Sequence, residues 1–197
     1  GIAFNFDKDD VEILHVEGNG SIVNRGDVTL LKVLINDTDN GTLVPANVEA
    51  KFWITYDNQN FDSGTLNYTQ ADASVSYYFN PDCSYSVGLQ YWKAGTVGNT
   101  CYKDVNSTNY TLTILGWLRN LVTQPTGSEI YYPNENVSIE GNLSDECGLA
   151  ISDAQVNFSV KHESYVNYCV ANAIGSGYYN CSINLTNAPG GYYSVTM

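Results

Sequence analysis

Eleven asparagines stand in Asn-x-Ser/Thr sequons, the pattern that accepts N-linked glycans in secreted proteins. With 23 Asn and 31 Ser plus Thr among 197 residues, random placement would give only about four sequons. The acceptor residues are Asn19, Asn36, Asn40, Asn67, Asn106, Asn109, Asn136, Asn142, Asn157, Asn180 and Asn184. The excess predicts an extracellular, cell-surface protein with glycans along its length.

Five cysteines in a chain of this kind predict disulfides. Cys83 and Cys101 are the only cysteines in the first 116 residues, so we expect them to bond and to staple the long connection before the last strand there. Cys169 and Cys181 flank a glycine-rich turn, Ile174–Gly177, and a hairpin at that turn would bring them nearly opposite. We therefore expect a second disulfide between them.

Cys147 is then the odd cysteine. Its partner is expected beyond Met197 or in another chain. The competing interpretation is that Cys147 bonds Cys169 or Cys181.

Catalytic chemistry finds little support in the residue pattern. The sequence has two histidines, His15 and His162, each in or beside a predicted strand and neither near a cysteine cluster. No G-x-S-x-G, H-E-x-x-H, C-x-x-C or P-loop motif occurs. We expect a protein that is not an enzyme and has no catalytic or metal-ligating residues.

Calcium is the one cofactor for which the sequence offers candidate ligands. Asp7–Asp10 and Asp37–Gly41 are rich in oxygen ligands. The second run departs from an EF-hand loop, because its glycine comes one position early and no glutamate follows at the twelfth position. Asn40-Gly41 is a strong turn dipeptide, so we interpret this run as a tight turn and expect no cofactor besides the glycans, with calcium as the alternative.

Two tryptophans are candidate binding residues. Trp53 opposes the apolar row of its predicted strand, and Trp92 opposes the row Tyr85, Val87, Leu89 and Tyr91. Both rings are therefore predicted to face outward, where they would stack on a sugar or a protein partner. The alternative is that each ring packs at a strand edge or under a loop.

Composition limits the kinds of partner that this protein can bind. The net charge is −13, with 8 basic against 21 acidic residues, which excludes a phosphate backbone as a natural partner. No stretch reaches the ~18 apolar residues of a membrane span, so no membrane contact is expected from this segment. The remaining expected partners are other copies of the chain and neighbouring domains of a surface protein.

Short β-branched and aromatic runs between turn signals predict an all-β fold of antiparallel sandwiches. The first group of predicted strands is Val11–Val16, Val28–Ile35, Val48–Tyr56, Ser74–Phe79, Tyr85–Trp92 and Tyr110–Leu115. The second group is Val137–Leu143, Ala154–Val160, Tyr165–Val170, Tyr178–Leu185 and Tyr192–Val195.

The sequons set the phase of several strands. In a strand, the Asn and the Ser/Thr of a sequon share one face and the middle residue points to the other. With the sequons in water, the residues predicted to face inward are Val156, Phe158, Val160, Cys181, Ile183, Leu185, Tyr110, Leu112 and Ile114. All of these are apolar, so two independent patterns agree.

The sequence repeats itself after about 108 residues. Gly20 and Gly41 match Gly127 and Gly148, and Tyr85–Val87 matches Tyr193–Val195. The repeat predicts two domains, residues 1–116 and 117–197. The second copy lacks the expected last strand, which leaves an open sheet edge. Either the polypeptide continues beyond Met197, or another chain supplies the strand.

The motifs resemble those of tandem immunoglobulin-like modules in prokaryotic, especially archaeal, glycosylated surface proteins. The resemblance rests on Asn142–Gly148 followed by Ala154, Val156 and Phe158, then Gly190–Val195, and on the matching Asn36–Asp39, Gly41, Ala46 and Val48. It implies a structural module such as a stalk, a surface layer or a filament subunit. The alternatives are an adhesin or carbohydrate-binding module and an accessory region of a larger secreted enzyme.

Overall fold

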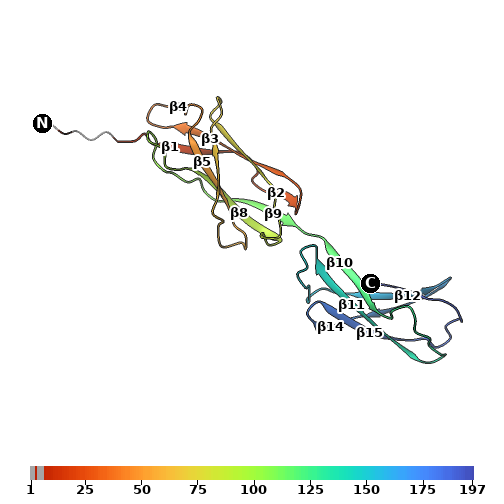
Figure 1. The fold of residues 1–197 in the computed structure, drawn as a ribbon. Coiled ribbons are helices and arrows are strands. Elements are labelled where there is room, and N and C mark those ends of the chain that lie inside the picture. Colours follow the sequence, from red (N-terminus) through yellow and green to blue (C-terminus); the bar gives the residue numbers. More distant parts are fainter. Residues whose placement is uncertain (1–2, 4–6) are drawn as a thin grey trace. The chain divides into compact units, whose positions relative to one another are not determined.

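The computed structural model describes residue 3 and residues 7–197. The chain forms two compact units, Gly1–Gly116 and Trp117–Met197, called unit 1 and unit 2 below. The described residues contain strands and turns and no helix, as the all-β prediction requires. Each unit is built from two sheets with a core between them (Figure 1).

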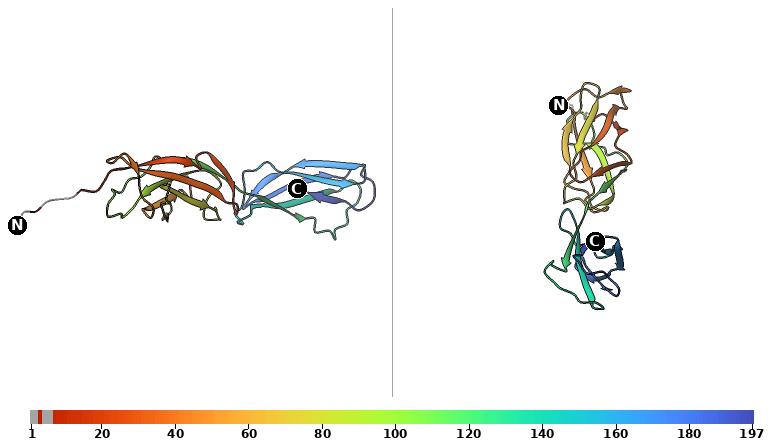
Figure 2. Two further views of the ribbon diagram at one scale, coloured as in Figure 1. Left: turned by 90° about the horizontal axis from the view of Figure 1, so that it is seen from above. Right: turned by 90° about the vertical axis from the view of Figure 1, so that its right-hand side faces the viewer.

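Unit 1 has one sheet of order β1-β3-β4, with β7 also paired to β3, and a second of order β2-β9-β8-β5-β6. Its strands are β1 (Val11–Glu17), β2 (Ser21–Asn24), β3 (Thr29–Asp37), β4 (Thr42–Leu43), β5 (Glu49–Ile54), β6 (Thr65–Tyr68), β7 (Ser74–Phe79), β8 (Gly88–Thr96) and β9 (Tyr110–Leu115). The two layers are seen edge-on in Figure 2. The first strands divide between the sheets: β1 pairs with β3, and β2 runs parallel to β9. This division, with the β8–β5 and β8–β9 antiparallel pairs, is an immunoglobulin-like arrangement.

Alternate residues of the facing strands fill the core of unit 1. On β3, Leu31, Val33 and Ile35 are fully buried, and on β5 Phe52 is fully buried too. The Phe52 ring stacks with the Trp92 ring of β8, their centroids 6.1 Å apart. The strand period of two, combined with two apolar inner faces, therefore produces the sandwich.

Unit 2 has one sheet of order β10-β11-β15-β14 and a second of order β13-β12-β16. Its strands are β10 (Leu118–Gln124), β11 (Asn136–Asp145), β12 (Asn157–His162), β13 (Tyr165–Val170), β14 (Asn172–Gly175), β15 (Tyr178–Asn184) and β16 (Ser194–Thr196). The pairing partners show which strands of the two units correspond: β10 corresponds to β1, β11 to β3, β12 to β5 and β15 to β7. Among the described residues of unit 2, no strand occupies the position that β9 has in unit 1.

The sequence-based prediction misplaces β8 and its counterpart in unit 2. The predicted strand Tyr85–Trp92 begins late, at Gly88, because Tyr85 closes a turn by donating its backbone N–H to Asp82 O. The match of Tyr85–Val87 with Tyr193–Val195 also fails. Lys51 pairs with Gly95, whereas its counterpart Ser159 pairs with Thr196, so this strand is shifted by 101 residues between the units. No local sequence pattern reports this shift.

The core assignment predicts a large loss of stability for one substitution on β9 and a small loss for a substitution at the next residue. We expect Ile114→Ala to lower the free energy of unfolding of unit 1 by about 2–5 kcal/mol, because Ile114 is fully buried and its loss leaves a cavity. Leu115→Ala, at a 44% exposed position of the same strand, is the control and should cost less than about 1 kcal/mol. Native-state hydrogen exchange measures each unit separately. Equal effects of the two substitutions would contradict the predicted phase.

Candidate functional site

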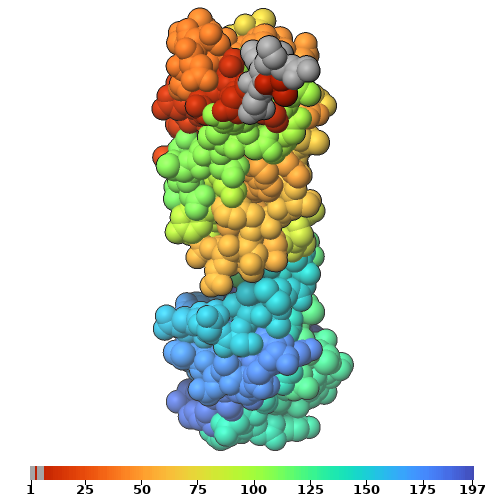
Figure 3. Space-filling view, turned by 90° about the vertical axis from the view of Figure 1, so that its left-hand side faces the viewer, coloured from red at the N-terminus to blue at the C-terminus, as the bar shows by residue number. Residues whose placement is uncertain are grey.

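The sequon asparagines all lie on the surface of their unit. Seven are exposed and four are half-buried, and none is buried. The exposed ones are Asn19, Asn40, Asn106, Asn109, Asn136, Asn157 and Asn184, and the half-buried ones are Asn36, Asn67, Asn142 and Asn180. Figure 3 shows one face of the surface, coloured by residue number.

The inward positions predicted from the sequon phase hold the cores. Val156, Phe158 and Val160 are 6%, 0% and 3% exposed, and Leu112 and Ile114 are fully buried. The predicted inward residues on β15 and β9 also pack on the cores, with Ile183 buried and Cys181, Leu185 and Tyr110 partly buried. The predicted inward faces of β12, β15 and β9 are therefore confirmed.

Some acceptor amides already take part in the local structure. The side-chain N–H₂ of Asn67 donates to Ser76 O at 2.5 Å, and that of Asn184 donates to Asn134 O at 3.2 Å and to Asn136 Oδ1 at 2.8 Å. The Asn40 amide donates to Asp37 Oδ2 at 2.8 Å. Glycosylation replaces one of the two amide hydrogens, so a glycan on Asn184, which donates to two acceptors, would displace a hydrogen bond. Asn157 stands exposed on the outer face of β12.

Cys169 and Cys181, at a sequence separation of 12, form a disulfide with Cα atoms 6.1 Å apart. The bond is the predicted one, but its position differs. Cys169 lies on β13 opposite Phe158, and Cys181 lies on β15 opposite Ile139, so the bond joins the two sheets. The hairpin at the glycine-rich turn is formed by β14 and β15 instead. Because Cys169 and Cys181 bond each other, neither is available to Cys147.

The predicted disulfide between Cys83 and Cys101 is wrong. Cys101 is a free, exposed thiol in a turn, where its backbone N–H donates to Asn99 Oδ1 at 2.8 Å. Neither Cys83 nor Cys147 is a free thiol. The prediction failed because it treated the cysteines nearest in sequence as partners, and nothing in their spacing reports the direction of each side chain.

Trp53 faces outward on β5, as predicted, and lies among cations. The ammonium groups of Lys51 and Lys93 lie 5.8 and 5.4 Å from its ring centroid, and Lys93 is also 4.7 Å from the Phe61 ring. A Cβ on Gly64 would come within 2.7 Å of the indole, so this loop fits against the ring only as glycine. The ring is half-buried by its neighbours, and Lys51, Lys93 and Phe61 were not singled out from the sequence.

Trp92 faces the core, so its predicted outward position is wrong. It is fully buried, and its indole N–H donates to Gly18 O at 3.1 Å. Two residues of the row predicted to face inward, Val87 and Leu89, are instead 49% and 44% exposed. Both faces of β8 carry apolar residues, and in such a strand alternation alone does not identify the inner face.

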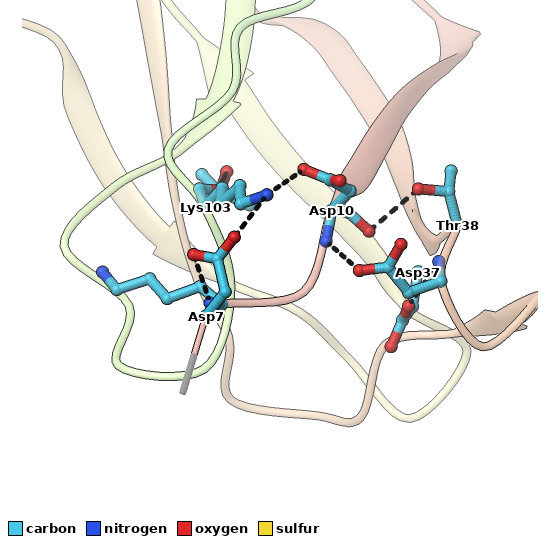
Figure 4. Close-up of polar contacts among 8 residues, drawn as sticks. Asp7, Asp10, Asp37, Thr38 and Lys103 are labelled. Atoms are coloured by element: carbon cyan, nitrogen blue, oxygen red, sulfur yellow. Dashed lines mark hydrogen bonds and ion pairs between the residues drawn. The ribbon is translucent and has the colours of Figure 1, made fainter. Parts of the chain in front are cut away.

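The two aspartate-rich runs come together in unit 1. The Lys103 ammonium lies 3.3 Å from Asp7 Oδ2 and 2.8 Å from Asp10 Oδ1, and the Thr38 hydroxyl donates to Asp10 O at 3.0 Å (Figure 4). These charge-assisted contacts raise the pKa of Lys103, with Asp10 as the main cause. Lys103 supplies the positive charge here.

Asp37 closes the turn over residues 37–41, the second candidate calcium run. Its carboxylate accepts hydrogen bonds from the Asn40 side chain at 2.8 Å and from the backbone N–H groups of Asp39 and Asn40. The Asn40 side chain is the main cause of its lowered pKa. Asp145 caps the corresponding turn of unit 2 in the same way, accepting from Cys147 N and Leu149 N. Within residues 7–197, no group of three or more His, Cys, Asp or Glu side chains is placed to hold a metal ion.

Both histidines have structural contacts. His15 Nε2 accepts from Asn19 N at 3.1 Å, and its ring lies 4.8 Å from that of Tyr110. His162 Nδ1 lies 2.7 Å from Tyr192 O. No helix in the described part of the chain has the length and apolar character of a membrane span.

No protein-family model and no curated protein matches this sequence. Among solved structures, FdeC, an Escherichia coli adhesin, is 12% identical over 96% of this chain and 59% of its own, with a TM-score of 0.43. Invasin, a bacterial integrin-binding protein, is 13% identical over 94% of this chain and 35% of its own, with a TM-score of 0.42. A tetra-tandem repeat from the extending region of a large adhesion protein is 15% identical over 91% and 42%, with a TM-score of 0.40.

This chain spans less than two thirds of the length of each of these proteins. At such identities and TM-scores the likenesses identify no family. The architecture described above rests on the strand pairing itself.

The inter-sheet disulfide predicts a stability loss confined to unit 2. We expect the double substitution Cys169→Ala and Cys181→Ala to lower the free energy of unfolding of unit 2 by about 2–3 kcal/mol. Without the disulfide the unfolded chain has a higher conformational entropy, which favours unfolding. Hydrogen exchange of the β11 amides measures the loss. Cys101→Ala is the control, since Cys101 is free and exposed, and it should leave both units unchanged. A loss of the same size in that variant would refute the assignment.

Proposed function

We propose that this protein is a non-enzymatic structural module of an extracellular, N-glycosylated cell-surface or filament protein, such as a stalk, a surface layer or a filament subunit. The observation that carries the proposal is that none of the eleven sequon asparagines is buried, while on β9, β12 and β15 the inward residues pack in the cores. Its partners are other copies of the chain or neighbouring domains. We also propose that it is similar to the modules of archaeal glycosylated surface proteins.

The mechanism is mechanical. Each sandwich hides its apolar rows between two sheets, and in unit 2 a disulfide ties one sheet to the other. Glycans on outward asparagines such as Asn157 would cover strand faces and edges, which protects them from proteases and from pairing with other chains. The fold then acts as a stable, coated structural element.

The polar side chains of the described residues support a structural role. The buried hydroxyl of Thr55 donates to Gln90 Oε1 at 2.8 Å, and the Gln90 amide donates to Ser86 O at 2.9 Å. In the described residues no buried side-chain nitrogen or oxygen lacks a hydrogen-bond partner. Such groups specify one packing arrangement.

The proposal predicts occupied sequons on the native protein. We expect glycopeptide mass spectrometry of protein from its own source to find glycans at Asn157 and Asn109, which are exposed on or beside strands. Asn187 is the matched control, because it is exposed and stands in no sequon. An intact mass equal to that of the bare polypeptide would remove the main support for the proposal.

The rival function is an adhesin or carbohydrate-binding module that uses Trp53, the candidate ring that faces outward. If the structural role is right, the protein binds no sugar at millimolar concentration on a glycan array. Trp53→Ala then lowers the stability of unit 1 by about 1–2 kcal/mol through lost packing and cation–π contact. Trp117→Ala, at a 60% exposed position, is the control and should have little effect. Sugar binding that disappears in Trp53→Ala would instead establish the adhesin function.

A further inference from the structure

We propose that the glycan on Asn157 lies over β13 and covers the exposed side chains of Tyr168 and Val170. The contact joins the apolar C–H faces of the first sugars to the phenol ring and the methyl groups of these two residues. The inference rests on the proposed function, because it needs a glycan at this sequon. It deepens that function by naming the protein surface that this glycan binds.

The outer face of β13 carries a row of apolar side chains. Val166, Tyr168 and Val170 point away from the core, because Cys169 between the last two packs against it. Their exposed fractions are 40%, 69% and 67%. Among the described residues β13 pairs only with β12, so it is an edge strand. Exposed apolar side chains on an edge strand promote aggregation, and a cover over them protects the folded protein.

The strand register places the Asn157 sequon beside this row. Asn157 pairs with Val170, and Ser159 pairs with Tyr168. Residues directly opposite each other share one face of a sheet, with Cβ atoms about 4.5–5.5 Å apart, and diagonal neighbours are about 7–8 Å apart. The Asn157 side chain is therefore next to Val170 and diagonal to Tyr168. The two most exposed members of the row are the two nearest to the glycan acceptor.

The Asn157 side chain is free to carry a sugar over the row. It is exposed, and among the described residues it has no hydrogen-bond partner that a glycan would displace. The face of an aromatic ring carries partial negative charge, which attracts the partly positive hydrogens on the C–H face of a sugar. The Tyr168 ring offers such a face, and the Val170 methyl groups add apolar area that the sugar removes from water.

The other sheet of unit 2 repeats the arrangement. Asn142 on β11 pairs with Leu121 of β10 on one side and with Tyr178 of β15 on the other. Leu121 and Tyr178 are 65% and 39% exposed. Each sheet of this unit therefore has a sequon directly opposite large apolar side chains that the protein itself leaves in water.

An attached glycan is favoured over a second copy of the chain as the cover. Covalent attachment makes the contact with β13 intramolecular, with an effective concentration on the order of millimolar. A second copy would bring a net charge of −13 towards a molecule of the same charge. The glycan on Asn157 would also obstruct its approach to the row.

The test is hydroxyl-radical footprinting of the full glycosylated chain, with the oxidation of Tyr168 measured by mass spectrometry. We expect Asn157→Gln, which removes the sequon, to raise the oxidation rate of Tyr168 by about twofold or more, because the ring loses its cover. Tyr78 is the matched control residue, since it is also 69% exposed and lies in unit 1. Its oxidation rate should not change.

Two further controls isolate the glycan. Asn180→Gln removes a sequon whose strand partners, Glu140 and Asn172, are polar, so it should leave the oxidation of Tyr168 unchanged. In protein made without glycans, Asn157→Gln should also have no effect on Tyr168, because the sugar and not the amide supplies the cover.

Glycopeptide analysis of the same sample separates this inference from the proposed function. An occupied Asn157 with equal Tyr168 rates in the two proteins would overturn the inference and leave the proposed function standing. An unoccupied Asn157 would overturn the inference and would also remove support from the proposed function. Protection of Tyr168 that persists in Asn157→Gln and increases with protein concentration would overturn it too, because a second copy would then be the cover.

Discussion

The closure of unit 1 depends on β9, which pairs with β8 on one side and with β2 on the other. Through these pairs β9 joins β2 to β8 and so completes the second sheet of the unit. Its inward residues complete a core that includes Phe52 and Trp92. Unit 2 has the same plan around a smaller core, and residues 7–197 place no strand at this position in it.

The alternation of the strands links the core to the surface chemistry. Because successive side chains point to opposite faces, a sequon on a strand places its Asn and Ser/Thr in water only when the residue between them is inside. Phe158 between Asn157 and Ser159 shows this relation in the structure. A coat of glycans and a packed core are thus compatible in one short strand. This compatibility is what makes a coated structural element a coherent function for this chain.

Prediction from sequence succeeded where the signal was local. Ser74–Phe79, Tyr110–Leu115 and Tyr165–Val170 are strands with the predicted bounds, because β-branched and aromatic runs between turn residues specify them. It missed β2 and β10, which have weaker apolar alternation and owe their pairing to β9 and β11. It also placed Trp92 on the wrong face, because β8 has apolar residues on both. Lys103, which binds Asp7 and Asp10 of the first aspartate run, lies too far away in sequence to be found by spacing.

The sequence by itself determined the all-β class, the repeat and the inner faces of β9, β12 and β15. These properties follow from periodicity within a few residues, where the alternation of side chains is independent of the rest of the fold. Only the tertiary structure decided that Cys169 and Cys181 join two sheets, that Cys101 stays a thiol, and that Trp92 is internal. It alone shows that Val170 and Tyr168 lie beside the Asn157 sequon. Each of these depends on which strands become neighbours, and loop lengths and packing decide that across the whole chain.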